Sequence, residues 1–252
     1  MYLIAAKSFA HYIKPAKFVI VDDGFSFEDK DLIRKHLRCV EFVERKTITS
    51  ESCPVGGCWE RLLTIADICR DHYVIQLDSD TVTVDDPIEV REFIARRASF
   101  TLSTKDGRKF ISTAEAASAM ASNSSPHIQV LAEKVLCEIP EIADRSYIRG
   151  CAGFAGFAQN SINRSSVEKI SSFMSNMLGA NVWARWGSEQ FTSNYLIANA
   201  PNKDLLPFEK YPYWKLGESS NVARLIHFIG DDRFTSSAYR RVAMKAVAQL
   251  RF

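Results

Sequence analysis

The segment Tyr73–Val84 places two carboxylates directly after a short apolar run. The run before Asp78 is rich in Val and Ile and bounded by polar residues, which is typical of a buried strand. Residues two apart on an extended chain point the same way, so Asp78 and Asp80 should face one point. In open α/β sheets, ligands bind at the carboxyl ends of strands. Two converging carboxylates repel unless a cation lies between them, so the pattern favours a divalent-metal site over a plain Asp turn.

Strand-like and helix-like segments alternate on both sides of this run, which predicts an α/β fold with a mostly parallel central sheet flanked by helices. The remaining predicted strands are Lys17–Val21, Val40–Val43, Ser99–Ser103 and Leu225–Gly230. The main predicted helices are Leu3–Ile13, Ser26–Leu37, Trp59–Cys69, Ser165–Leu178 and Trp183–Ala198. We expect residues 1–252 to form a single domain, with a helical excursion at about 112–145 and a C-terminal helix at about 236–252.

Composition excludes several classes of protein. The net charge of +2 gives no electrostatic basis for binding nucleic acid. No apolar run approaches the roughly 18 residues that span a bilayer, and no secretion signal is expected. The six scattered cysteines favour a reducing cytoplasm over a disulfide scaffold. The C-terminal helix is basic and amphipathic, so we expect it to pack on the domain, with peripheral contact to a membrane as the alternative. The sequence does not set the oligomeric state.

Four short motifs resemble, in the same order along the chain, those of the GT-A type glycosyltransferases, nearest the glycogenin/galactosyltransferase-like branch. The motifs are Phe18–Gly24, which ends in Asp-Asp-Gly, then Asp78-Ser79-Asp80, then Gly187–Gln190 with Asn194, and last Ile226–Gly230 with its His-x-x-Gly. Each motif alone is weak, but together they cover nearly the whole chain. The resemblance implies a single Rossmann-like GT-A domain.

The resemblance also implies an enzyme that moves a sugar from a nucleoside-diphosphate sugar to an acceptor hydroxyl on a glycan, a lipid-linked molecule or a protein. It assigns the residues to four groups. Asp22, Asp23, Asp78, Ser79 and Asp80 would contact the donor nucleotide; Asp78, Asp80 and His227 would bind Mn²⁺ or Mg²⁺; Glu189 would be catalytic; Trp186, Gly153 and Gln190 would lie on the acceptor side. Carboxylates with one imidazole suit these metals better than zinc.

Two other functions fit some of the same residues. Leu77–Val82 and Phe228–Asp232 also resemble the first and last motifs of haloacid-dehalogenase-like phosphatases, in which Asp78 would be the nucleophile. That interpretation leaves Asp22, Asp23, Glu189 and His227 without a role. The other alternative is a catalytically silent module that binds a sugar nucleotide or a glycan.

The start of the chain departs from the GT-A pattern. These enzymes usually have one more strand and a helix before the Asp-Asp-Gly strand. Either Tyr2–Ala5 supplies this first strand, or the strand is missing.

Overall fold

The computed structural model describes residues 1–105, 109–214 and 222–250. Its strands are β1 (Phe18–Asp22), β2 (Val40–Glu44), β3 (Val74–Leu77), β4 (Thr81–Thr83), β5 (Ser99–Leu102), β6 (Ile111–Ser112), β7 (Ser146–Tyr147), β8 (Cys151–Phe157), β9 (Lys203–Leu206) and β10 (Leu225–His227). Its helices are α1 (Tyr2–Tyr12), α2 (Phe27–His36), the 3₁₀ helix η1 (Arg45–Thr47), α3 (Trp59–Ile68), α4 (Ile88–Ala95), α5 (Thr113–Met120), α6 (Ile128–Lys134), the 3₁₀ helix η2 (Leu136–Glu138), α7 (Arg164–Leu178), α8 (Ala180–Trp183), α9 (Ser188–Ala198), α10 (Asp232–Thr235) and α11 (Ala238–Gln249).

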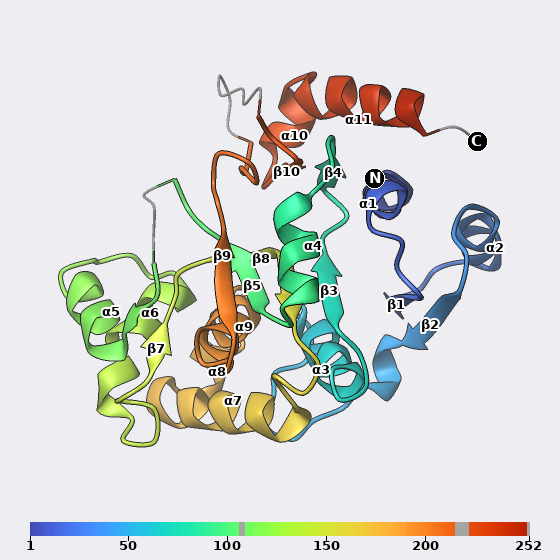
Figure 1. Cartoon of the computed structure of the whole chain (residues 1–252). Helices are drawn as coiled ribbons and strands as arrows, with labels where there is room; N and C mark the ends of the chain where they lie inside the picture. The colour runs from blue at the N-terminus through green and yellow to red at the C-terminus, as the bar shows by residue number, and fades with distance from the viewer. Residues whose placement is uncertain (106–108, 215–221, 251–252) are drawn as a thin grey trace.

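The centre of the molecule is a four-stranded sheet in the order β3-β8-β5-β9 (Figure 1). Strands β3, β5 and β9 run in one direction, and β8 runs against them. Both ladders beside β8 are therefore antiparallel, and only β5–β9 is parallel. The predicted α/β class is confirmed, but the expectation of mostly parallel pairing needs this correction. The reason is that β8 inserts between two strands that would otherwise be parallel neighbours.

Helices cover both faces of this sheet. Side chains alternate along β8, so Phe154 points to one face and Ala155 and Phe157 to the other. Phe154 packs in a cluster with α1, α4 and β5, while Ala155 and Phe157 pack in a larger cluster with α3, α6, α7 and α9. Apolar side chains on both faces explain why the β8 sequence reads as continuously apolar rather than alternating.

The N-terminal part of the chain forms a smaller ladder of its own. β1 pairs with β2 in parallel, in register from Phe18 opposite Val40 to Asp22 opposite Glu44. Within the described residues this ladder shares no hydrogen-bonded pairing with the four-stranded sheet. Tyr2–Ala5 lies in α1, so the proposal that it forms a strand is wrong. The segment is helical because the apolar face of α1 packs against β4 and α11.

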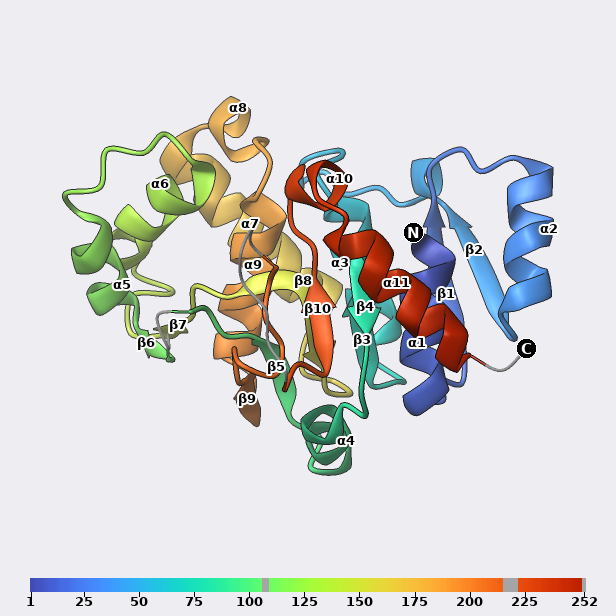
Figure 2. The same cartoon turned by 90° about the horizontal axis from the view of Figure 1, so that it is seen from above.

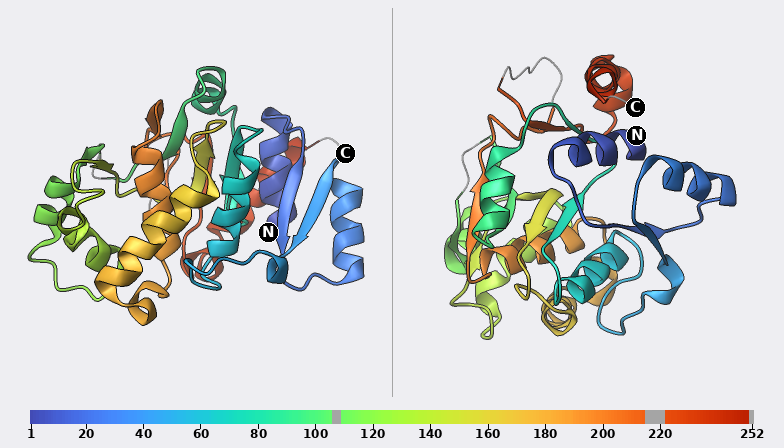
Figure 3. Two further views of the ribbon diagram at one scale, coloured as in Figure 1. Left: turned by 90° about the horizontal axis from the view of Figure 1, so that it is seen from below. Right: turned by 45° about the vertical axis from the view of Figure 1, so that its right-hand side comes forward.

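The two ends of the molecule are built differently (Figures 2 and 3). At one end, α5, α6 and η2 occupy the predicted excursion at 112–145, with the short β6–β7 ladder at its base. At the other end, α2 flanks β1 and β2. α11 occupies most of the predicted C-terminal helix, whose last two residues, 251 and 252, lie outside the described residues. Among the helices that the structure describes, none is long and apolar enough to cross a membrane.

Candidate functional site

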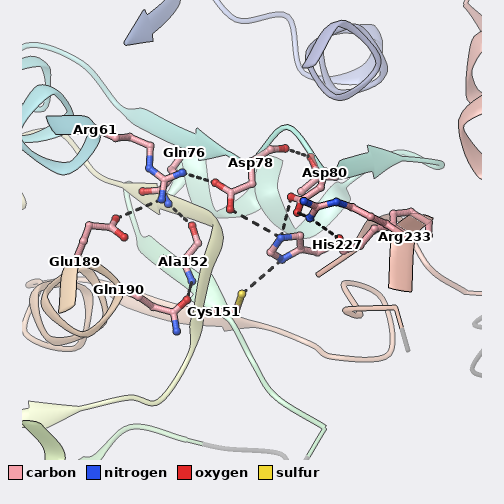
Figure 4. A network of polar contacts seen from close by, with 12 residues as sticks. Arg61, Gln76, Asp78, Asp80, Cys151, Ala152, Glu189, Gln190, His227 and Arg233 are labelled. Carbon is pink, nitrogen blue, oxygen red and sulfur yellow. Dashed lines mark hydrogen bonds and ion pairs between the residues drawn. The ribbon is translucent and has the colours of Figure 1, made fainter. Parts of the chain in front are cut away.

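The sharp connection between β3 and β4 carries Asp78 and Asp80, and two backbone hydrogen bonds hold it in place. The Asp78 N–H donates to the Gly153 carbonyl of β8 at 2.9 Å, and the Phe228 N–H donates to the Asp80 carbonyl at 2.9 Å. β4 pairs antiparallel with β10, which sets His227 opposite Thr81. The imidazole of His227 therefore reaches the two aspartates although it is remote in sequence (Figure 4).

Asp78, Asp80 and His227 form a group whose ligand atoms all lie within 4.8 Å of one another. The Nε2 atom of His227 lies 3.1 Å from Oδ1 of Asp80 and 3.9 Å from Oδ2 of Asp78. Oδ1 of Asp80 is buried and accepts no well-aligned hydrogen bond from the described residues. Two carboxylates and one imidazole are a donor set that suits Mn²⁺ or Mg²⁺.

Two arginines also contact these aspartates. Arg61 of α3 forms an ion pair with Asp78 and lies 3.5 Å from the carboxylate of Glu189. Arg233 of α10 forms an ion pair with Asp80 at 2.6 Å. Arg61 is not among the site residues predicted from the sequence. The one sequence signal for it is weak: Arg61 lies in the first turn of a helix, where the helix dipole disfavours a cation slightly.

The carboxyl and imidazole groups have shifted pKa values with identifiable causes. Burial raises the pKa of Asp78, against the opposing effect of Arg61. Burial also acts to raise the pKa of Asp80, but His227 and Arg233 outweigh it and lower the value. Burial would lower the pKa of His227, yet its contacts with Asp80 and Cys151 raise it to about 10. Titrating groups with shifted pKa values that lie close together are typical of functional sites.

Glu189 lies in the first turn of α9, where the helix dipole favours a carboxylate. Gly187, with a φ of 103°, precedes the helix, and the Trp59 indole N–H fixes the start of α9 by donating to Ser188 Oγ at 2.9 Å. The Glu189 side chain is buried, and burial raises its pKa to about 7 despite the nearby Arg61. A carboxyl group with this pKa can exchange a proton near neutral pH.

This raised pKa predicts a pH-dependent effect of Glu189→Gln on stability. A raised carboxyl pKa contributes stability below the unfolded value of 4.5, and the contribution is lost as pH rises through about 7. We therefore expect Glu189→Gln to be more stable than the wild type at pH 8, by up to about 3 kcal/mol, with the difference shrinking toward pH 5. Urea unfolding at both pH values measures this. An equal stability difference at pH 5 and pH 8 would contradict the assigned pKa.

Gly153 and Gln190, which the family resemblance assigns to the acceptor side, lie near the metal group. Gly153 is part of β8, and Gln190 is bonded to that strand. A Cβ atom on Gly153 would lie 1.9 Å from Cε1 of His227, so only glycine fits beneath the imidazole ring. Gln190 of α9 accepts a hydrogen bond from the Ala152 N–H at 3.3 Å. Gly153 thus lies against His227, and Gln190 holds the strand that carries Gly153.

We expect Gly153→Ala to displace His227 and weaken Mn²⁺ binding. The new methyl group overlaps the imidazole, and overpacking of this kind costs about 1–3 kcal/mol of stability. In a His227→Ala background the ring is gone, so the same change should cost little. Urea unfolding of the four proteins and Mn²⁺ titration by electron paramagnetic resonance test this. The steric explanation fails if Gly153→Ala costs the same in both backgrounds.

The remaining predicted site residues lie outside the metal group. Both carboxylate oxygens of Asp22 are engaged within the chain, one by the N–H groups of Gly24 and Phe25 and the other by Lys30. Asp23 pairs with Arg45 at 2.7 Å. Two further predicted site residues are solvent-exposed: Ser79, and Trp186 with an exposed fraction of 72%.

Comparison with known proteins identifies the fold. No protein-family model and no curated protein matches the sequence. Among solved structures, the galactosyltransferase LgtC in complex with donor and acceptor sugar analogs superposes with a TM-score of 0.52 at 10% identity, over 98% of this chain and 91% of LgtC. An active-site mutant of LgtC gives 0.51 at 11% identity over the same shares of the two chains. Mouse xyloside xylosyltransferase 1 gives 0.49 at 13% identity, over 89% and 92%.

The two LgtC superpositions extend over almost the whole of both chains, so the likeness is one of complete folds rather than of a shared fragment. At this level of identity, the likeness concerns architecture and carries no statement about substrates. It agrees with the α/β sheet and with an Asp-x-Asp turn at the end of β3. The chain has the GT-A fold of the galactosyltransferase LgtC, as its four sequence motifs predicted.

Proposed function

We propose that this protein is a metal-dependent glycosyltransferase that moves a sugar from a nucleoside-diphosphate sugar to an acceptor hydroxyl. The observation that carries the proposal is the convergence of Asp78, Asp80 and His227 at one turn of a GT-A fold. The three residues come from two segments about 150 positions apart, and a close backbone approach at Gly153 keeps the imidazole in place.

Asp78, Asp80 and His227 would hold Mn²⁺ or Mg²⁺, which supplies positive charge to the departing nucleoside diphosphate. The chain's own cations have related tasks. Arg233 lies beside Asp80 and is placed to pair with a diphosphate oxygen. Arg61 contacts both Asp78 and Glu189, orients their carboxyl groups and opposes the rise in pKa that burial causes in each.

Glu189 is the proposed catalytic residue. In an inverting reaction its carboxylate would take the proton of the acceptor hydroxyl, for which a pKa of about 7 is well suited. In a retaining reaction the same side chain would instead orient the donor sugar or stabilise positive charge at its anomeric carbon. Its distance of 3.5 Å from Arg61 places it beside the metal group in either case.

We propose that Asp22, Asp23 and Ser79 contribute to the donor-nucleotide side and that Trp186, Gln190 and Gly153 face the acceptor. The exposed indole of Trp186 offers a face on which a sugar ring can stack. The acceptor would be a glycan, a lipid-linked molecule or a protein. All six cysteines are free, which supports a reducing compartment such as the cytoplasm.

The phosphatase alternative has less support. It needs an acidic residue from the last phosphatase motif, Phe228–Asp232, to lie beside the nucleophile Asp78 and bind metal with it. Asp231, the first candidate for that role, is exposed and lies outside the group formed by Asp78, Asp80 and His227. The GT-A likeness over nearly the whole chain also favours glycosyl transfer.

A thermal-shift panel of uridine and guanosine diphosphate sugars, with and without Mn²⁺, tests the proposal. We expect stabilisation that requires both metal and nucleotide, since a ligand that binds only the folded state raises its stability. Donor hydrolysis or transfer then separates an enzyme from a silent binding module, which would bind without turnover. Magnesium-dependent hydrolysis of an aryl phosphate that is lost in Asp78→Asn would overturn the proposal in favour of a phosphatase.

A further inference from the structure

Helix α11 has one buried face and one free face. Ala238, Ala243 and Ala246 point inward and pack on the body of the molecule. Met244 and Val247 point outward and are 62% and 36% exposed. The helix therefore packs on the domain, as its amphipathic sequence predicts, and still presents apolar side chains to its surroundings.

These outward side chains belong to an apolar groove between α1 and α11 rather than to scattered surface positions. The groove has a volume of about 410 Å³. Its apolar lining residues are Ile4, Tyr239, Ala243, Met244, Val247 and Ala248. Single exposed apolar residues are common on soluble proteins, but a continuous apolar lining with a charged rim is typical of an interaction surface.

The charged side chains of the two helices that line this groove all have one sign, apart from the histidine of α1. α11 carries Arg240, Arg241 and Lys245 and contains no Asp or Glu, and α1 likewise has Lys7 but no acidic residue. Within the described residues, Arg240 and Lys245 form no ion pair. The local excess of positive charge is large for a chain whose net charge is only +2.

We propose that the outer face of α11, with the α1–α11 groove, docks the protein on an anionic membrane surface. Met244 and Val247 would enter the boundary between headgroups and acyl chains, while Arg240, Arg241 and Lys245 extend toward lipid phosphates. A second copy of this chain is a poorer partner, because a symmetric contact would set the same basic side chains against each other.

The docking face is joined directly to the candidate site. α11 follows α10 after two residues, and α10 carries Arg233, which pairs with Asp80. Docking would therefore bring the Asp80 side of the site close to the bilayer. Together with the proposed function, on which this one consequence rests, it favours a lipid-linked acceptor over a soluble one.

Co-sedimentation with vesicles tests the docking without metal, nucleotide or activity. We expect the wild type to bind phosphatidylcholine vesicles that contain about one third phosphatidylglycerol and not to bind vesicles of pure phosphatidylcholine. The bound protein should dissociate from the vesicles at high salt. Arg240→Gln/Lys245→Gln should weaken binding about 25-fold, since each basic residue near an anionic surface contributes about fivefold. Met244→Glu/Val247→Glu should weaken it at least about tenfold.

Val55→Glu is the matched control, because Val55 is 84% exposed on the loop before α3 and lies outside this groove. It should bind vesicles as the wild type does, and circular dichroism and thermal unfolding check that each variant folds. The proposal is overturned if the wild type binds neither kind of vesicle or both equally, or if the double variants bind like the wild type. It is also overturned if light scattering shows a dimer that Met244→Glu/Val247→Glu dissociates, without vesicle binding. Because the assay needs no ligand, its result is independent of the thermal-shift panel.

Discussion

Replacing Asp80 with alanine is expected to abolish both Mn²⁺-dependent nucleotide binding and sugar transfer. Asp80 supplies the buried Oδ1 that lies 3.1 Å from Nε2 of His227, and its lowered pKa keeps it ionised over the whole neutral range. A metal that neutralises a leaving diphosphate contributes several kcal/mol to the transition state, so turnover should fall by about 10³-fold or more. The same variant should show no thermal shift with Mn²⁺ and a uridine or guanosine diphosphate sugar.

Asp71→Ala is the matched control for this loss. Asp71 lies at the opposite end of β3, is exposed, and pairs only with its neighbour Arg70 among the described residues. Its removal should leave metal-dependent binding and turnover unchanged. A metal-dependent shift that persists in Asp80→Ala would show that the metal is held elsewhere. Loss of the shift in both variants would point to a general effect on folding.

Local sequence signals predicted the individual elements well where side chains within one segment determine them. The helix after Ser26 is an example: Ser26 and Asp29 form a reciprocal capping box, and basic residues occupy the last turn of α2. The face of α3 containing Leu62, Leu63 and Ala66 is buried as its spacing indicates. Such elements depend on short-range chemistry that is visible in the sequence.

Features that depend on pairing between remote segments were not predicted. β9 has the sequence Lys-Asp-Leu-Leu, which carries no strand signal of its own and forms because β5 offers it a parallel partner. The predicted helix Trp183–Ala198 is helical only from Ser188, where α9 begins, because α8 ends at Trp183 and Gly187, with a φ of 103°, precedes α9. The reversed direction of β8 likewise follows from its neighbours and not from its own sequence.

The candidate site divides in the same way. Asp78 and Asp80 are predictable because two carboxylates that converge at the end of an apolar strand repel unless a cation lies between them, and His227 is predictable through the resemblance to a family motif. Arg61 was missed because an arginine in an amphipathic helix is usually a solvated residue. Only the fold shows that α3 turns it toward Asp78 and Glu189.

Replacing Arg61 with methionine should strongly destabilise the protein, whatever its function. Arg61 is the cation shared by Asp78 and Glu189, and methionine keeps most of its length without the charge. Removing one partner of a fully buried ion pair costs about 3–5 kcal/mol. The Arg61 and Asp78 side chains keep 29% and 27% of their exposure, so we expect about 2–4 kcal/mol. Arg70→Met, at an exposed pair just after α3, should cost less than about 0.5 kcal/mol.

The origin of this loss can be separated by pH and by a double-mutant cycle. Without Arg61, Glu189 has no ion-pair partner among the described residues and Asp78 keeps only His227, 3.9 Å away, so the pKa values of both carboxyl groups should rise further. Protonation then relieves the repulsion, so the destabilisation should be largest above pH 7 and smaller at pH 5. Arg61→Met/Glu189→Gln should recover about 1–2 kcal/mol relative to Arg61→Met, because one buried charge is gone. The measurement is urea unfolding of the wild type, Arg61→Met, Glu189→Gln and the double variant at pH 5 and pH 8. Additive effects with no pH dependence would mean that Arg61 acts by packing alone.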